Sequence, residues 1–242
     1  MTVENWHPKL PYASAPDAPQ TLHSGLPLSW AGAAPLSLEN RRSALLAKRA
    51  SDILLSLLGI IALAPLLILV ALAIKLSSRG PVLFRQARTG VGGGTFHIYK
   101  FRSMYADRSD TTGIQHTTAG DDRVTPIGRL LRRTSIDELP QLFNVLRGDM
   151  AMVGPRPHVP GMLVNGTPYA ELVPYYAMRT AMPPGVTGWA QINRLRGEVA
   201  SREHAIARVE HDIAYIQNYS VWLDLKCIWL TLRNEFIGGN AV

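Results

Sequence analysis

The chain has 242 residues, a formal net charge of +7 and a sequence pI of about 9.8. Its partners are therefore expected to be anionic: a nucleic acid, an acidic membrane surface or a phosphorylated substrate. The length suffices for a domain with a substantial core. The single cysteine, Cys227, excludes an internal disulfide, and the histidines lack the spacing of a zinc site.

The N-terminal segment, residues 1–37, is rich in Pro, Ala and Ser and shows little periodicity. This composition predicts a disordered tail, and the segment has no apolar stretch of the kind found in signal peptides. An Ala- and Arg-rich helix is expected to follow it, so residues 38–80 form a second unit together with the apolar run described next.

The apolar run Ile53–Ile74 carries no charge over 22 residues, which is long enough to cross a bilayer. A buried core helix is the alternative. Arginine and lysine flank the run on both sides, and the positive-inside rule then places both ends in the cytoplasm. Pro65 lies near its middle and removes a backbone hydrogen bond. Together these features predict a re-entrant membrane helix that bends at Ala64-Pro65, with a spanning helix as the competing topology.

A β-hairpin is expected next, with strands at Val82–Gln86 and Thr95–Phe101 and a glycine-rich turn at 90–94. The turn lacks the third glycine and the βαβ context of a dinucleotide site. Residues 107–122 are polar and predict a loop. Ile127–Arg133 predicts a basic helix.

The central stretch, residues 135–146, has apolar residues at helical spacing: Leu139, Leu142, Phe143 and Leu146. Asp137 and Glu138 lie at its N-terminal end, where the helix dipole favours negative charge. One interpretation is structural, since Ser135 and Glu138 match a capping box and Asp137 could itself be the N-cap. The other is chemical, with the two carboxylates belonging to a reactive site.

Arg156 stands between two prolines, after a short apolar strand at Met150–Val153. The prolines hold it extended and reduce the entropy that it loses on gripping an anion. An ordinary turn arginine is the alternative. Pro183–Trp189 predicts a rigid turn, and from about Ser201 the chain is expected to be helical. The fold class is therefore α+β, mostly helical, with a small β-hairpin or sheet.

Five motifs in series carry a resemblance over residues 40–235. They are Lys48-Arg49-x-x-Asp52 before the apolar run, Tyr99–Met104, Ser135–Gln141, Val153–Pro157 and Pro184–Trp189. In this order they resemble the bacterial sugar transferases, the monotopic phosphoglycosyl transferases that start exopolysaccharide and glycan assembly. The chain resembles the short form of the family. It departs from many members in having Ala64-Pro65 where they have Ser-Pro.

The resemblance implies an enzyme of the cytoplasmic face of the bacterial inner membrane. Such an enzyme moves a phospho-sugar from a UDP-sugar to undecaprenyl (polyprenyl) phosphate and releases UMP. Residues 81–242 would then be its cytoplasmic catalytic region, ending in interfacial helices. Galactose and glucose are the sugars that the resemblance favours, and no residue pattern decides between them or sets the oligomeric state.

The resemblance also implies roles for individual residues. Asp137 would be the nucleophile that forms an aspartyl-phosphosugar intermediate, and Glu138 its catalytic neighbour. Mg²⁺ is the expected cofactor, with Asp137 and Glu138 as its candidate ligands. Lys100, Arg132 and Arg156 are the candidate phosphate-binding residues.

A competing function is a non-catalytic, membrane-anchored basic adaptor that binds acidic lipid or nucleic acid. It accounts for the net charge and the apolar run. It does not account for Asp137 and Glu138 lying between basic elements, because a polyanion would be repelled there. The chain also lacks the basic and aromatic interleaving that stacks bases, so nucleic acid is not expected as a partner.

Overall fold

The computed structural model describes residues 42–110, 120–197, 199 and 201–237. The predicted disordered tail, residues 1–37, lies outside the described residues, as does the middle of the predicted loop at 107–122. The described part of the chain is mostly helical and contains three two-stranded sheets, which confirms the α+β class.

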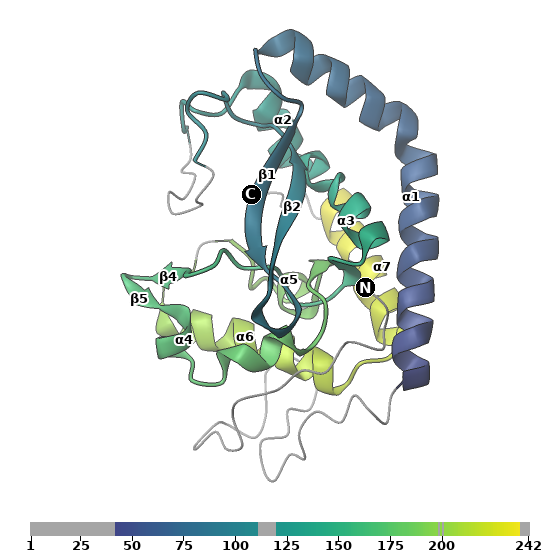
Figure 1. Cartoon of the computed structure of the whole chain (residues 1–242), viewed down its shortest axis with the longest axis vertical. Coiled ribbons are helices and arrows are strands. Elements are labelled where there is room, and N and C mark those ends of the chain that lie inside the picture. The colour runs from purple at the N-terminus through teal and green to yellow at the C-terminus, as the bar shows by residue number, and fades with distance from the viewer. Residues whose placement is uncertain (1–41, 111–119, 198, 200, 238–242) are drawn as a thin grey trace.

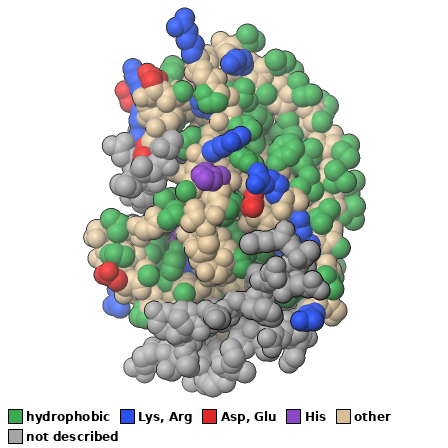
Figure 2. Space-filling view, viewed as in Figure 1, with side chains coloured by type: hydrophobic (Ala, Val, Ile, Leu, Met, Phe, Trp, Pro, Cys, Tyr) green, Lys and Arg blue, Asp and Glu red, His purple; other side chains and the backbone are tan. Residues whose placement is uncertain are grey.

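Helix α1 (Arg42–Ser77) contains the whole apolar run and stays helical through Pro65. It follows one edge of the molecule and bends toward its C-terminal end (Figure 1). The expected break is therefore a bend in a continuous helix. The helix is long and apolar enough to cross a membrane. Apolar side chains gather along the same edge (Figure 2), and the large exposed ones on α1 are Leu46, Ile53, Leu54, Leu57, Leu58, Ile61, Ile68, Leu69, Leu72 and Leu76.

The predicted hairpin is confirmed, with β1 (Leu83–Thr89) paired antiparallel with β2 (Thr95–Phe101). The first strand continues beyond its predicted end at Gln86, as far as Thr89. The turn between them contains a short 3-10 helix, η3 (Val91–Gly93). Asn144 fastens the hairpin to helix α3 (Gln141–Arg147): its side chain accepts from the Tyr99 amide at 2.9 Å and donates to the His97 carbonyl at 2.8 Å.

Helix α2 (Pro126–Arg133) begins at Thr125, whose hydroxyl accepts from the Gly128 amide at 3.0 Å. Proline suits the first position of this helix, because a backbone N–H at that position would have no partner within the helix. Gly128 lies directly against the backbone of Ser103, because a Cβ there would overlap the Ser103 carbonyl. The basic helix expected at Ile127–Arg133 is confirmed within one residue.

The central stretch forms a 3-10 turn, η4 (Ile136–Glu138), followed by α3, which Gly148 ends in a left-handed conformation at φ 93°. The expected apolar face is only partly right. Leu142 is buried, but Phe143 is exposed, and the polar Gln141 and Asn144 are buried instead. Asn144 is buried because its side chain hydrogen-bonds the backbone of the hairpin. No periodicity in the sequence reveals this contact.

The remaining elements form the second half of the core. Strands β3 (Ala151–Val153) and β6 (Gly185–Thr187) pair in parallel, and β4 (Leu163–Val164) pairs antiparallel with β5 (Thr167–Pro168). The helices are α4 (Tyr169–Leu172), the 3-10 helix η5 (Tyr176–Ala181), α5 (Trp189–Ile192), α6 (Arg202–Gln217) and α7 (Val221–Ile237). The expectation of a helical C-terminal part from about Ser201 is confirmed, with Ser201 as the N-cap of α6.

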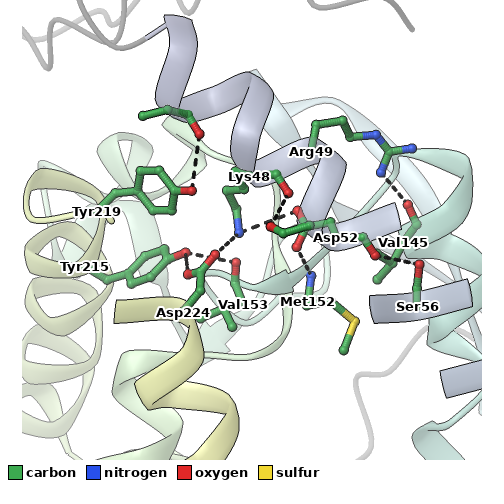
Figure 3. A network of polar contacts seen from close by, with 12 residues as sticks. Lys48, Arg49, Asp52, Ser56, Val145, Met152, Val153, Tyr215, Tyr219 and Asp224 are labelled. Atoms are coloured by element: carbon green, nitrogen blue, oxygen red, sulfur yellow. Dashed lines mark hydrogen bonds and ion pairs between the residues drawn. The ribbon is translucent and has the colours of Figure 1, made fainter. Parts of the chain in front are cut away.

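A buried polar network joins the first turns of α1 to the C-terminal half of the fold (Figure 3). Lys48 lies 2.8 Å from Asp224 of α7 and 3.5 Å from Asp52. Asp52 in turn accepts from the Met152 amide of β3 at 2.9 Å, and Asp224 accepts from the Tyr215 hydroxyl at 2.6 Å. The other end of α1 is held by Arg102, which donates to carbonyls of the last residues of α1 and the segment after it: Ile74, Ser78 and Arg79. Both ends of α1 therefore contact the same folded body.

Candidate active site

The two predicted carboxylates lie side by side in the chain but in different surroundings. Turn η4 starts after Ser135, which has a left-handed backbone at φ 54° and makes no side-chain capping bond. The capping-box interpretation is therefore wrong, and so is Asp137 as an N-cap, because α3 begins after Pro140. The Glu138 side chain points to two cations from other elements.

Glu138 is clamped between Lys100 of β2 and Arg156 of the proline-flanked segment. Its Oε1 lies 2.7 Å from Lys100 Nζ and 2.9 Å from Arg156 Nη2. Burial works against ionisation of this carboxyl, but Arg156 and Lys100 outweigh it and hold the pKa of Glu138 well below its usual range. Glu138 is therefore a permanently charged anion at neutral pH.

Asp137 is buried, and its carboxylate makes no hydrogen bond or ion pair within the described residues. Burial, with the negative charge of Glu138, raises the pKa of Asp137 to about 6. The positive charges of Lys100, Arg132 and Arg156 act in the opposite direction. The site thus holds one unpaired carboxylate, ionised at neutral pH, within the field of three cations.

Of the predicted phosphate-binding residues, Lys100 and Arg156 meet directly at Glu138. Arg132 comes from the last turn of α2, and its charge reaches Asp137 from there. Pro65 is exposed on the apolar helix α1, and the next residues, Leu66 and Leu67, pack in one cluster with Leu131 and Ile136.

Arg88 of β1 is a site residue that the sequence did not reveal. It donates to the Pro157 carbonyl at 3.2 Å and to the Gln86 side chain. Burial and the nearby Arg156 lower its pKa to about 10, so it stays protonated at neutral pH. A signal for it existed. Arg88 and Gln86 are two positions apart on a strand that pairs with β2, so both share one face of the hairpin with Lys100.

The two carboxylates are the candidate ligands for a metal ion. Among the described residues, no three acidic, histidine or cysteine side chains converge as ligands. Mg²⁺ is usually held by one or two carboxylates and completed by substrate phosphates and water. Asp137 fits that pattern, since its oxygens make no hydrogen bond or ion pair with the part of the chain that the structure describes. Both oxygens of Glu138 already face Lys100 or Arg156, so it fits only if those cations turn to another anion.

Comparison with known proteins places the chain in a family. The profile described as "Bacterial sugar transferase" matches residues 43–238. The chain is 51% identical over 197 residues to "Undecaprenyl-phosphate glucose phosphotransferase" of Komagataeibacter xylinus, covering 81% of this chain and 37% of that protein. It is 52% identical over 165 residues to "Exopolysaccharide production protein PSS" of Rhizobium leguminosarum bv. phaseoli, covering 68% and 82%.

A third relative is "UDP-glucose:undecaprenyl-phosphate glucose-1-phosphate transferase" of Escherichia coli (strain K12), 47% identical over 175 residues. That match covers 72% of this chain and 36% of the relative. The chain thus spans little more than a third of the length of two of these three relatives. The region matched by the family profile, residues 43–238, includes every residue of the cluster around Asp137.

Proposed function

The chain belongs to the bacterial sugar transferase family, and from that premise we propose that it transfers a phospho-sugar from a UDP-sugar to undecaprenyl (polyprenyl) phosphate. UMP is the expected co-product, and the reaction would be the first membrane step of exopolysaccharide or glycan assembly. Two relatives are named for glucose, which makes UDP-glucose the first donor to test. Family membership favours an enzyme over the basic adaptor.

The observation that carries the proposal is the contrast between the two carboxylates. Glu138 is neutralised by Lys100 and Arg156, whereas Asp137 has no hydrogen-bond partner within the described residues. A nucleophile must be ionised and must have a free oxygen, and Asp137 meets both conditions at neutral pH. Three cations around it would attract and orient the phosphates of a donor.

The reaction then takes two steps. An Asp137 carboxylate oxygen attacks the phosphorus that bears the sugar, the bond from that phosphorus to the bridging oxygen of UMP breaks, and UMP leaves with the electron pair. In the second step a phosphate oxygen of the polyprenyl phosphate attacks the same phosphorus, and the Asp137 carboxylate leaves. No proton has to be transferred to Asp137 in either step.

Glu138 has a definite role in this scheme. It occupies Lys100 and Arg156 when no donor is present, so the two cations are held in place and do not spread apart. An arriving diphosphate competes for them because it carries more charge and offers the guanidinium a fork of acceptors. Glu138 would then be free of both cations, and Glu138 and Asp137 would be the residues that hold Mg²⁺ together with the phosphates. When bound, the ion neutralises the charge of the diphosphate.

We place the enzyme on the cytoplasmic leaflet of the bacterial inner membrane, with α1 re-entrant. Both ends of α1 contact the same folded body, which a helix crossing a bilayer of about 30 Å would not do. Helix α7 adds a second apolar surface with tryptophans suited to an interface: Trp222, Leu225, Trp229 and Leu232 are exposed on it.

The test is UMP release by the purified full chain in membranes or detergent, with a panel of UDP-sugars and undecaprenyl phosphate. A single turnover without lipid should already release UMP and add the mass of the phospho-sugar to the peptide that carries Asp137. Asp137→Asn should abolish both, and the variant should still fold because the two side chains are nearly isosteric. A requirement for both substrates before any UMP appears would contradict the covalent route.

A further inference from the structure

The segment Pro155–His158 is held at every one of its backbone carbonyls. The Pro155 carbonyl accepts from the Gly185 amide at 2.9 Å, and the His158 carbonyl accepts from the Thr89 amide at 2.9 Å. Arg88 Nη1 donates to the Pro157 carbonyl at 3.2 Å. The carbonyl of Arg156 itself accepts from Arg179 Nη2 at 2.7 Å.

Arg179 is a buried cation on η5, and Asp212 of α6 holds its side chain in place. Its Nε and Nη2 lie 2.9 Å and 2.6 Å from Asp212 Oδ2 on α6, and both residues are almost fully buried. One guanidinium thus joins α6 to the backbone of the anion-binding segment. Its planar, forked geometry lets Nη2 serve both partners, which a lysine ammonium on a flexible stem would not reproduce.

We propose that Arg179 is a positioning residue of the reaction: through Asp212 and the carbonyl of Arg156 it fixes the point from which the Arg156 side chain reaches the phosphates. The effect that we expect on kinetics rests on the proposed function. Arg179 need not touch the substrate. A buried ion pair can be replaced by apolar side chains at little cost in stability. A role in positioning therefore explains its presence here better than a role in stability alone.

The decisive measurement is a double-mutant cycle on kcat/KM for the UDP-sugar, with Arg179→Lys and Arg156→Ala. Arg179→Lys alone should lower kcat/KM by about ten- to a hundredfold, the range for a misplaced catalytic group. In the Arg156→Ala background the same change should cost less than about twofold, because the group that Arg179 positions is gone. Equal losses in both backgrounds would overturn the inference.

Two further variants separate positioning from folding. The pair Arg179→Met with Asp212→Leu removes the charges together, and it should keep the melting temperature while losing kcat/KM as Arg179→Lys does. Full activity of this pair would overturn the inference. Glu210→Gln is the matched control: Glu210 also lies on α6 and accepts from Tyr175, just before η5, at 3.1 Å, but it does not touch Arg156. It should leave kcat/KM unchanged.

Hydrogen exchange gives a readout that needs no turnover. The amides that report on the segment are those of Thr89 and Gly185, which donate to the carbonyls of His158 and Pro155. Arg179→Lys should speed exchange of these two amides, and Glu210→Gln should not. If the wild-type chain releases no UMP but this difference in exchange is seen, the proposed function fails and the positioning role stands. If UMP is released and exchange of these two amides is the same in Arg179→Lys and wild type, the positioning role fails alone.

Discussion

At the scale of single residues, the pKa of Asp137 makes a prediction about pH. The raised value of about 6 means that Asp137, the proposed nucleophile, gains a proton as the pH falls through 6. The logarithm of kcat/KM should therefore fall with a slope of one below pH 6 and level off above it. Lys100→Met removes a charge that lowers this pKa, so the acid limb of its residual activity should move to higher pH. An acid limb near pH 4 would indicate that Asp137 is not the titrating group.

The same pKa predicts that Asp137 costs stability. A carboxyl whose folded-state pKa is raised from 3.8 to about 6 loses stability as the pH rises between those values, because the folded state then holds the proton that the unfolded state has released. At pH 7 the cost is about 3 kcal/mol. Asp137→Asn should raise the melting temperature in detergent at pH 7. Glu138→Gln is the control and should lower it, since Lys100 and Arg156 lose their counter-charge.

Arg156 allows a test of fork geometry against charge. Arg156→Lys keeps the charge but loses the planar pair of donors, so kcat/KM for the UDP-sugar should fall by about 1–3 kcal/mol in activation free energy. The measurement is steady-state kinetics at fixed ionic strength. Unchanged kinetics in Arg156→Ala would reduce Arg156 to a turn residue.

The sequence predicts which residues form the site better than it predicts which of them contact one another. It picks out Asp137, Glu138, Lys100 and Arg156, and the structure brings them together. It does not reveal that Glu138 occupies Lys100 and Arg156, because that contact joins residues 38 and 18 positions apart. Arg179 is missed for a similar reason, since its partner Asp212 is 33 positions away and neither lies in a periodic pattern.

At the scale of elements, close backbone packing explains a glycine that helix propensity alone would not favour. Gly128 lies against the Ser103 backbone, so a Cβ there would force α2 away from the segment after β2. Gly128→Ala should lower stability even though alanine favours helices. Gly59→Ala in α1 is the control, because its Cβ would meet only the tip of Leu142 at 3.3 Å. Thermal unfolding of both variants measures the difference, and equal melting temperatures would contradict the packing argument.

Elements with a strong local pattern are predicted best. The hairpin, the basic helix and α6 follow from turn residues, periodicity and a serine cap. The segment 158–180 has no such pattern, because its short elements β4, α4 and η5 are stabilised by packing on α6 and not by their own periodicity. The 3-10 turn η4 was predicted as the start of a helix because its left-handed Ser135 has no distinctive sequence signal.

At the scale of the whole molecule, the topology of α1 can be tested with single cysteines. Ser43→Cys and Ser77→Cys, each in a Cys227→Ala background, lie at the two exposed ends of the helix. Ser77 is preferable to Ser78, whose hydroxyl binds Arg102 at 3.0 Å. Both should react with an impermeant maleimide only in inside-out vesicles. Labelling of either from the periplasmic side would establish a spanning helix.

The buried polar network at the N-terminal end of α1 also sets an order of events during synthesis. Lys48 and Asp224 are 176 residues apart in the chain, yet they form one buried contact. At roughly 5–20 residues per second, a ribosome needs on the order of ten seconds or more to reach the aspartate after the lysine has been made. The apolar helix is translated early, so Lys48 remains without its partner Asp224 during that time. Only when α7 has been made can this contact form, so the last helix of the described residues completes the packing of the first one.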